Sequence, residues 1–98
     1  MKTLNSHQQE LMNRIYDLIL DKNISDKERD ILRQAKVAIE KGGMFESHLI
    51  NLRNQLLPLV VSQQISKRGL EFYKILRADR KISLGVGDSL LVGILRNQ

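Results

Sequence analysis

The stretch SDKERDILRQAKVAIEKGG, residues 25–43, contains both ends of a helix and its apolar face. Ser25 and Glu28 have the S-x-x-E spacing of a capping box, in which each side chain accepts a hydrogen bond from the other residue's backbone N–H. The glycine pair at 42–43 ends the helix, because glycine readily adopts the left-handed conformation of a helix C-terminus. Between these signals the apolar residues recur at helical spacing, which predicts an amphipathic helix. These apolar residues are Ile31, Leu32, Ala35, Ala38 and Ile39.

The rest of the chain shows the same periodicity on both sides of this stretch. Asn5 or Ser6 can cap a first helix, because a short side-chain oxygen accepts hydrogen bonds from the first turn. In the last predicted helix the expected inward residues are Gly69, Phe72, Tyr73, Ile75 and Leu76. The predicted elements are helices over about 6–22, 26–42, 47–66 and 66–81, followed by a tail over 82–98.

The third predicted helix has the broadest apolar surface, so we expect it to contact more than one neighbour. Pro58 removes one backbone hydrogen bond from it. Because the apolar spacing continues through the proline, we expect a bend near Asn54–Pro58 and not two separate helices. Its expected inward face consists of Leu49, Leu52, Leu56, Leu59, Val60 and Gln63.

Four amphipathic helices with short connections favour antiparallel neighbours, because a short loop cannot return the chain to the same end. The sequence lacks strand-like alternation. The prediction is an all-α fold, a single domain over 1–98 that forms an antiparallel up-down four-helix bundle with a short C-terminal extension.

Composition excludes several classes of protein. The chain has no cysteine, so it can form neither a disulfide framework nor a thiolate metal site. The longest apolar runs are six residues, whereas a membrane-spanning helix needs about 20. The first ten residues have no apolar segment of the secretory type. We therefore expect a cytoplasmic protein, with partial membrane association left open.

Residues that carry chemistry are sparse. His7 and His48 lie far apart, and no H-E-x-x-H motif, carboxylate cluster or Asp/His combination is expected to accompany them. Asp17 and Asp21 are one turn apart and could hold a cation, but solvation is the simpler interpretation. The glycines at 85–87 lack the third glycine and preceding strand of a dinucleotide loop, which favours a hinge. We expect no enzyme, no metal and no cofactor.

The net charge of +5 comes from the second half of the chain. Residues 1–49 carry eight basic and eight acidic side chains, whereas residues 50–98 carry eight basic and three acidic ones. This basic half predicts a surface for an anionic or membrane-proximal partner. A solvated helix face, and a tail that packs back onto the bundle, are the alternatives. The candidate partner-binding residues are Lys67, Arg68, Lys74, Arg77, Arg80 and Lys81, with Leu90, Leu91, Ile94 and Leu95 of the tail.

Four segments carry a family resemblance: residues 15–19 (IYDLI), 38–42 (AIEKG), 49–53 (LINLR) and 70–73 (LEFY). In this order, and followed by a variable tail, they resemble the immunity proteins of the pediocin-like (class IIa) bacteriocins, in the enterocin A immunity family. The patterns are loose ones of size, charge and helix order, and they cover nearly the whole chain.

The resemblance implies an antiparallel four-helix bundle that protects a producer cell from its own pore-forming peptide. It implies action from the cytoplasmic side at the membrane-embedded mannose phosphotransferase permease with the bacteriocin bound. It also implies that the C-terminal half distinguishes between bacteriocins. The tail here is short, so specificity inferred from longer-tailed relatives transfers poorly.

Two other functions remain open at this point. The basic fourth helix would suit a small nucleic-acid-binding regulator, although aromatic and amide side chains for base reading are scarce there. Specific nucleic-acid recognition is therefore not expected. The broad apolar helix would suit an assembly module that pairs with another chain.

Overall fold

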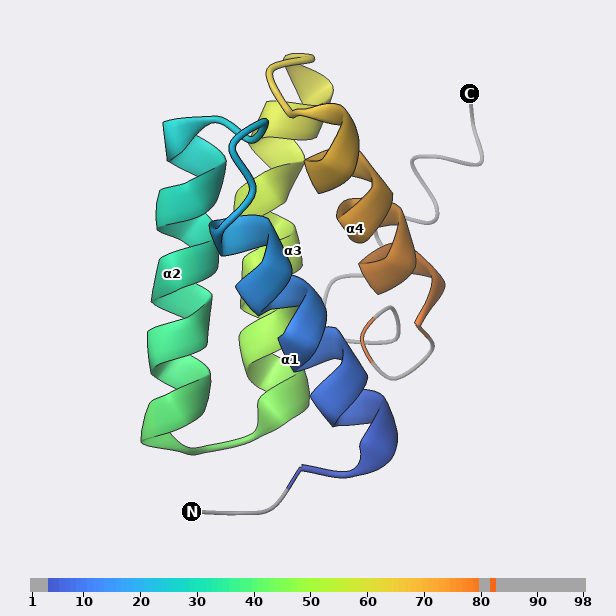
Figure 1. Cartoon of the computed structure of the whole chain (residues 1–98). Coiled ribbons are helices and arrows are strands. Elements are labelled where there is room, and N and C mark those ends of the chain that lie inside the picture. The colour runs from blue at the N-terminus through green and yellow to red at the C-terminus, as the bar shows by residue number, and fades with distance from the viewer. Residues whose placement is uncertain (1–3, 80–81, 83–98) are drawn as a thin grey trace, which may run out of the picture.

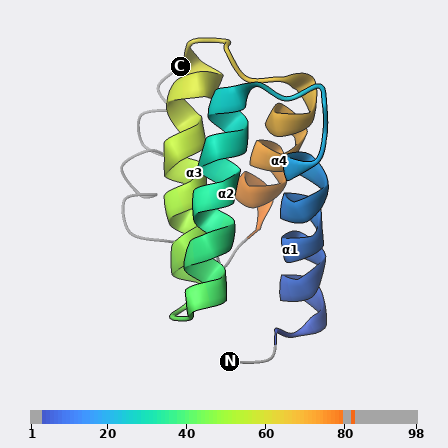
Figure 2. The same ribbon diagram turned by 60° about the vertical axis from the view of Figure 1, so that its left-hand side comes forward.

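A computed structural model describes residues 4–79 and 82 of the chain. Its four helices are α1 (Ser6–Ile19), α2 (Asp26–Lys41), α3 (Phe45–Val61) and α4 (Lys67–Ala78). Consecutive helices run in opposite directions (Figure 1). In Figure 2, α2 and α3 lie side by side and α1 and α4 form the other side of the bundle. Helices are the only regular elements among the described residues, so the predicted all-α, up-down four-helix bundle is confirmed.

The core is made of the apolar faces that the periodicity predicts. Its fully buried members come from all four helices, and Ile82 beyond α4 is buried with them. Gly69, Phe72, Tyr73 and Leu76 of α4 are buried as predicted, and Ile75 is partly buried. The largest fully buried apolar side chains are Ile15, Leu32, Leu49, Leu52, Leu56, Leu76 and Ile82.

Helix ends differ from the predicted ends by up to five residues. α1 stops at Ile19, before the predicted 22, and α3 starts two residues early, at Phe45. α3 also stops at Val61, because Gln63 adopts a left-handed backbone with φ of 60°. Gln63 is exposed, so its predicted place on the inward face of α3 is wrong. α4 is shorter than predicted, Lys67–Ala78 against 66–81.

α3 continues through Pro58 as one helix, in agreement with the prediction. The missing proline N–H leaves one carbonyl of the preceding turn without its helical donor. At the end of the helix, the Ser62 hydroxyl and backbone N–H both donate to the Pro58 carbonyl, at 2.8 and 3.0 Å. The bend expected at this point stays a prediction.

Glu28 joins the N-termini of two helices. As predicted, it forms a capping box with Ser25 at the start of α2. It is also completely buried, and its Oε1 accepts hydrogen bonds from the backbone N–H and the hydroxyl of Ser66, at 3.0 and 2.8 Å. Ser66 is the N-cap of α4. One carboxylate therefore caps α2 and fixes the start of α4.

Hydrogen bonding decides the ionisation of Glu28. Burial raises the pKa of this carboxyl, but hydrogen bonds from Ser25 and Ser66 outweigh burial and hold the pKa below its ordinary value. The carboxylate of Glu28 fits against α4 only because residue 69 is glycine, since a Cβ at Gly69 would lie 2.0 Å from Glu28 Oε1. The charged, fully bonded carboxylate thus depends on a glycine in the first turn of α4.

Two arginines fix other segments of the chain. Arg29 donates from Nε to the Ile19 carbonyl at 2.9 Å and from Nη2 to the Asp21 carbonyl at 2.5 Å. It thereby satisfies carbonyls that have no helical donor at the end of α1. Arg53 on α3 is 3% exposed and donates to the Ile82 carbonyl at 3.2 Å, which holds Ile82 against α3.

Candidate functional site

The predicted basic residues of α4 lie on the surface. Lys67, Arg68, Lys74 and Arg77 are all exposed. Lys67 and Lys74 lie on the side of α4 opposite its buried residues, and Arg68 and Arg77 lie on the two flanks of that side. The other six candidates lie outside the described residues: Arg80, Lys81, Leu90, Leu91, Ile94 and Leu95. The described part of the candidate surface is therefore the outer face of α4.

Some of these basic side chains interact with other residues of the protein. Arg68 Nε lies 2.9 Å from Asp21 Oδ2, so Arg68 links α4 to the end of α1. Arg77 also has an interaction within the chain. Lys67 and Lys74 form no ion pair within residues 4–79 and 82. Among the described basic residues of α4, these two lysines are therefore the most available to a binding partner.

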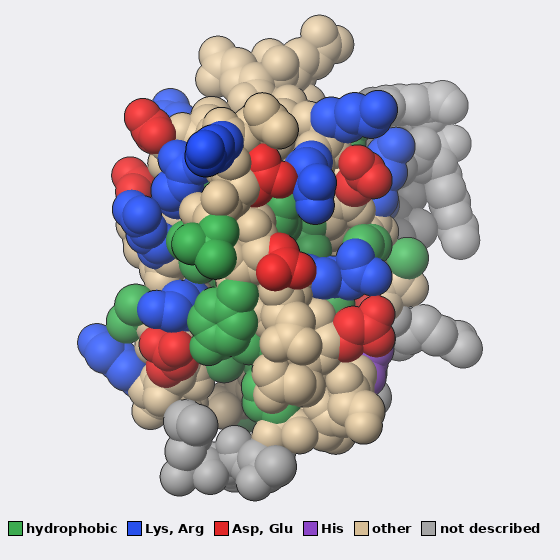
Figure 3. Space-filling view, in the orientation of Figure 1, with side chains coloured by type: hydrophobic (Ala, Val, Ile, Leu, Met, Phe, Trp, Pro, Cys, Tyr) green, Lys and Arg blue, Asp and Glu red, His purple; other side chains and the backbone are tan. Residues whose placement is uncertain are grey.

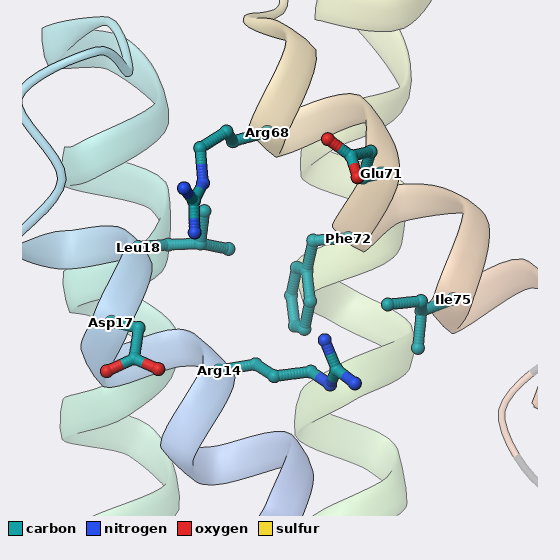
Figure 4. A pocket seen from close by; sticks show the side chains of 7 residues that line it. All are labelled: Arg14, Asp17, Leu18, Arg68, Glu71, Phe72 and Ile75. Atoms are coloured by element: carbon teal, nitrogen blue, oxygen red, sulfur yellow. The ribbon is translucent and has the colours of Figure 1, made fainter.

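A charged groove runs between α1 and α4, with a cavity volume of about 300 Å³. Figure 4 shows Arg14 extending from α1 towards the Phe72 ring, with Arg68 reaching in from α4 above Leu18. Two acidic side chains, Asp17 and Glu71, also line it. The groove therefore carries both signs of charge over an apolar floor. Neither Arg14 nor Glu71 was among the predicted site residues.

The structure brings one histidine and one aspartate together, contrary to the prediction. His7 Nε2 lies 2.5 Å from Asp79 Oδ2, so the start of α1 contacts the end of α4. The pair was missed because 72 positions separate its members in the sequence. His48 Nε2 lies 2.7 Å from the carbonyl of Gly42 and closes the turn between α2 and α3.

No metal centre is formed by the part of the chain that the structure describes. No group of three or more His, Cys, Asp or Glu side chains there could hold an ion. Of the two aspartates considered for a cation, Asp21 pairs with Arg68 and accepts the Asn23 backbone N–H at 2.7 Å. Asp17 is exposed at the groove.

Within residues 4–79 and 82, none of the helices is both long and apolar enough to cross a membrane. In the described part of the chain, the basic helix α4, partly paired through Arg68, lies beside the groove that it forms with α1.

The sequence model of the bacteriocin immunity protein family matches residues 6–81, from the first residue of α1 to just beyond α4. The chain belongs to this family. The match includes all four helices, Glu28 with its two serine donors, and the basic face of α4.

One relative is the lactococcin-A immunity protein of Lactococcus lactis subsp. cremoris. The two chains are 27% identical over 73 residues, which cover 74% of each. No solved structure matches the chain significantly. Both the family and this relative agree with the immunity function that the resemblance implies.

Proposed function

We propose that the protein protects the cell that makes it against a pediocin-like pore-forming bacteriocin. It acts from the cytoplasmic side, at the complex of the bacteriocin with the mannose phosphotransferase permease. The observation that carries the proposal is the family match across all four helices. The resemblance of the four quoted segments to the pediocin-like immunity proteins supports the narrower target.

Protection by this bundle works through binding and needs no bond to be made or broken. The proposed contact is the outer face of α4, where Lys67 and Lys74 are exposed and form no ion pair among the described residues. Arg68 and Arg77 lie on α4 at the edges of this face. The remaining predicted residues follow α4 in the sequence and continue the proposed contact; they are Arg80, Lys81, Leu90, Leu91, Ile94 and Leu95.

The identity of the bacteriocin is the part of the proposal that most needs a test. The name of the Lactococcus lactis relative refers to lactococcin A, whereas the resemblance points to pediocin-like peptides. A suitable panel therefore contains several pediocin-like bacteriocins together with lactococcin A.

The experiment expresses the protein in a sensitive strain and measures growth inhibition by each peptide of the panel. We expect protection against at least one pediocin-like peptide. An empty vector is the negative control, and an immunoblot of the soluble fraction establishes that the protein is abundant. Sensitivity to every pediocin-like peptide, in cells that contain folded protein, would overturn the proposal.

A further inference from the structure

An apolar groove lies between α1 and α2, with a cavity volume of about 440 Å³. Figure 3 shows hydrophobic side chains gathered between these two helices, with Lys and Arg side chains beside them. The groove is distinct from the proposed contact on α4, because it shares no residue with that surface. Its lining residues are Tyr16, Ile19, Leu20, Arg33, Lys36 and Val37.

Two apolar residues of the groove are exposed, and the other two are partly buried. Leu20, which follows α1, is 81% exposed, and Val37 in the C-terminal half of α2 is 43% exposed. A single exposed leucine is ordinary on a protein surface. Two exposed apolar side chains that line one groove give an apolar site that a partner or a membrane can cover.

The charge around the groove favours an anionic partner. Arg33 is exposed and forms no ion pair with any residue in the described ranges 4–79 and 82. Glu40 contacts two residues of the groove: its carboxylate accepts a hydrogen bond from the Tyr16 hydroxyl at 3.0 Å and lies 3.7 Å from Lys36 Nζ. Its charge is therefore partly balanced within the protein, while the charge of Arg33 is not.

We propose that this surface docks onto the interface of an anionic lipid bilayer. Leu20 and Val37 enter the headgroup region, while Arg33 lies among the lipid phosphates beside the Lys36–Glu40 pair. An apolar centre with an available cation at its edge is complementary to a membrane with anionic headgroups. Tyr16 fits the same boundary, because its ring is apolar and its hydroxyl is polar.

This inference goes beyond the proposed function, because it requires neither a bacteriocin nor a permease. In this proposal the groove between α1 and α2 binds the lipid surface, and the outer face of α4 binds the protein partner.

The test is vesicle flotation with the full chain and no bacteriocin. Vesicles contain either phosphatidylglycerol mixed with phosphatidylcholine or phosphatidylcholine alone. We expect binding to the anionic vesicles that weakens as salt is added, because exposed charges are screened. Leu20→Gln should weaken binding by about tenfold, since burial of a leucine side chain is worth at least that factor. Arg33→Gln should weaken it by about fivefold, since each cation near anionic lipid contributes about 1 kcal/mol.

Val61→Gln is the matched control. Val61 is an aliphatic residue at the end of α3, 74% exposed, and does not line the groove. This variant should bind vesicles like the unchanged protein, and circular dichroism should show the same helical content for all four proteins.

Three results would overturn the proposal. The first is equal flotation with anionic and neutral vesicles, or none with either. The second is an equal loss from Val61→Gln and Leu20→Gln. The third is a dimer in sedimentation that Leu20→Gln dissociates, since a second copy would then cover the groove. Any of these could occur while the growth assay still shows protection, so the two proposals fail separately.

Discussion

Replacement of Gly69 by alanine should destabilise this protein, although the same exchange in a helix usually stabilises one. In a helix, alanine is favoured over glycine by about 1 kcal/mol, so the exchange usually stabilises a protein. Here the new Cβ would lie 2.0 Å from Glu28 Oε1 and 3.2 Å from Glu28 Cδ. A flexible surface glutamate would move aside at little cost. Glu28 is completely buried and held by hydrogen bonds, so its displacement is expensive.

The magnitude follows from the hydrogen bonds that are lost. A carboxylate moved away from Gly69 gives up both bonds from Ser66, and each charge-assisted bond is worth about 1.5–3 kcal/mol. Helix propensity returns about 1 kcal/mol. We therefore expect Gly69→Ala to lower the free energy of unfolding by about 2–5 kcal/mol, in spite of alanine's higher helix propensity.

Urea denaturation, followed by far-ultraviolet circular dichroism, measures this loss in a double-mutant cycle with Glu28→Ala. In the Glu28→Ala background the carboxylate is absent, and the nearest neighbour of the new Cβ is Ile65 Cγ1 at 3.0 Å. Ile65 is only partly buried and can shift, so Gly69→Ala should be neutral or stabilising by up to about 1 kcal/mol. Trimethylamine N-oxide, added equally to all four proteins, keeps the less stable variants folded at zero urea. An equal effect of Gly69→Ala in both backgrounds would show that the Glu28 carboxylate is not what makes the substitution unfavourable.

The remaining predictions concern Glu28, Arg29 and Lys74. The pKa of Glu28 is lower in the folded than in the unfolded protein, so its stabilising contribution is present above the unfolded value and is lost as pH falls through the folded value. Glu28→Gln should therefore be less stable at neutral pH and show a shallower acid loss in urea titrations below pH 4.5. Arg29→Met should lower the free energy of unfolding in urea by about 1–3 kcal/mol, because carbonyls at the end of α1 lose their donors. Lys74→Glu should reduce protection in the growth assay with unchanged helical content, whereas Lys27→Glu on α2 should not.

Each of these has an outcome that contradicts it. Parallel stability curves for Glu28→Gln and the unchanged protein would show that this carboxylate does not titrate as described. An unchanged urea midpoint for Arg29→Met would mean that water caps α1 equally well. Full protection by Lys74→Glu would remove this lysine from the proposed contact.

The helices and their caps could be predicted because their signals are local. Periodicity and the Ser25–Glu28 spacing act within one or two turns, and both appear in the structure as predicted. The end of α3 was harder to place, because Val61 and Gln63 give no strong stop signal before the backbone turns left-handed.

The contacts that join helices could not be predicted from one sequence. Ser66 donates to a carboxylate 38 positions earlier, and Asp79 meets a histidine 72 positions away. Periodicity places Glu28 and Arg53 on the buried faces of α2 and α3, but it does not identify the distant partners that satisfy these charged side chains. The basic face of α4 was predicted from charge alone, but the Asp21 partner of Arg68 emerged only from the fold.

The central claim is that the basic face of α4 meets the bacteriocin–permease complex. Affinity purification of the tagged protein from membranes that contain the mannose phosphotransferase permease tests it directly, with and without bacteriocin. We expect the permease to co-purify only when the bacteriocin is present, and not with the Lys67→Glu, Lys74→Glu double variant. Protection without any association, or association that the charge reversal leaves unchanged, would contradict the claim.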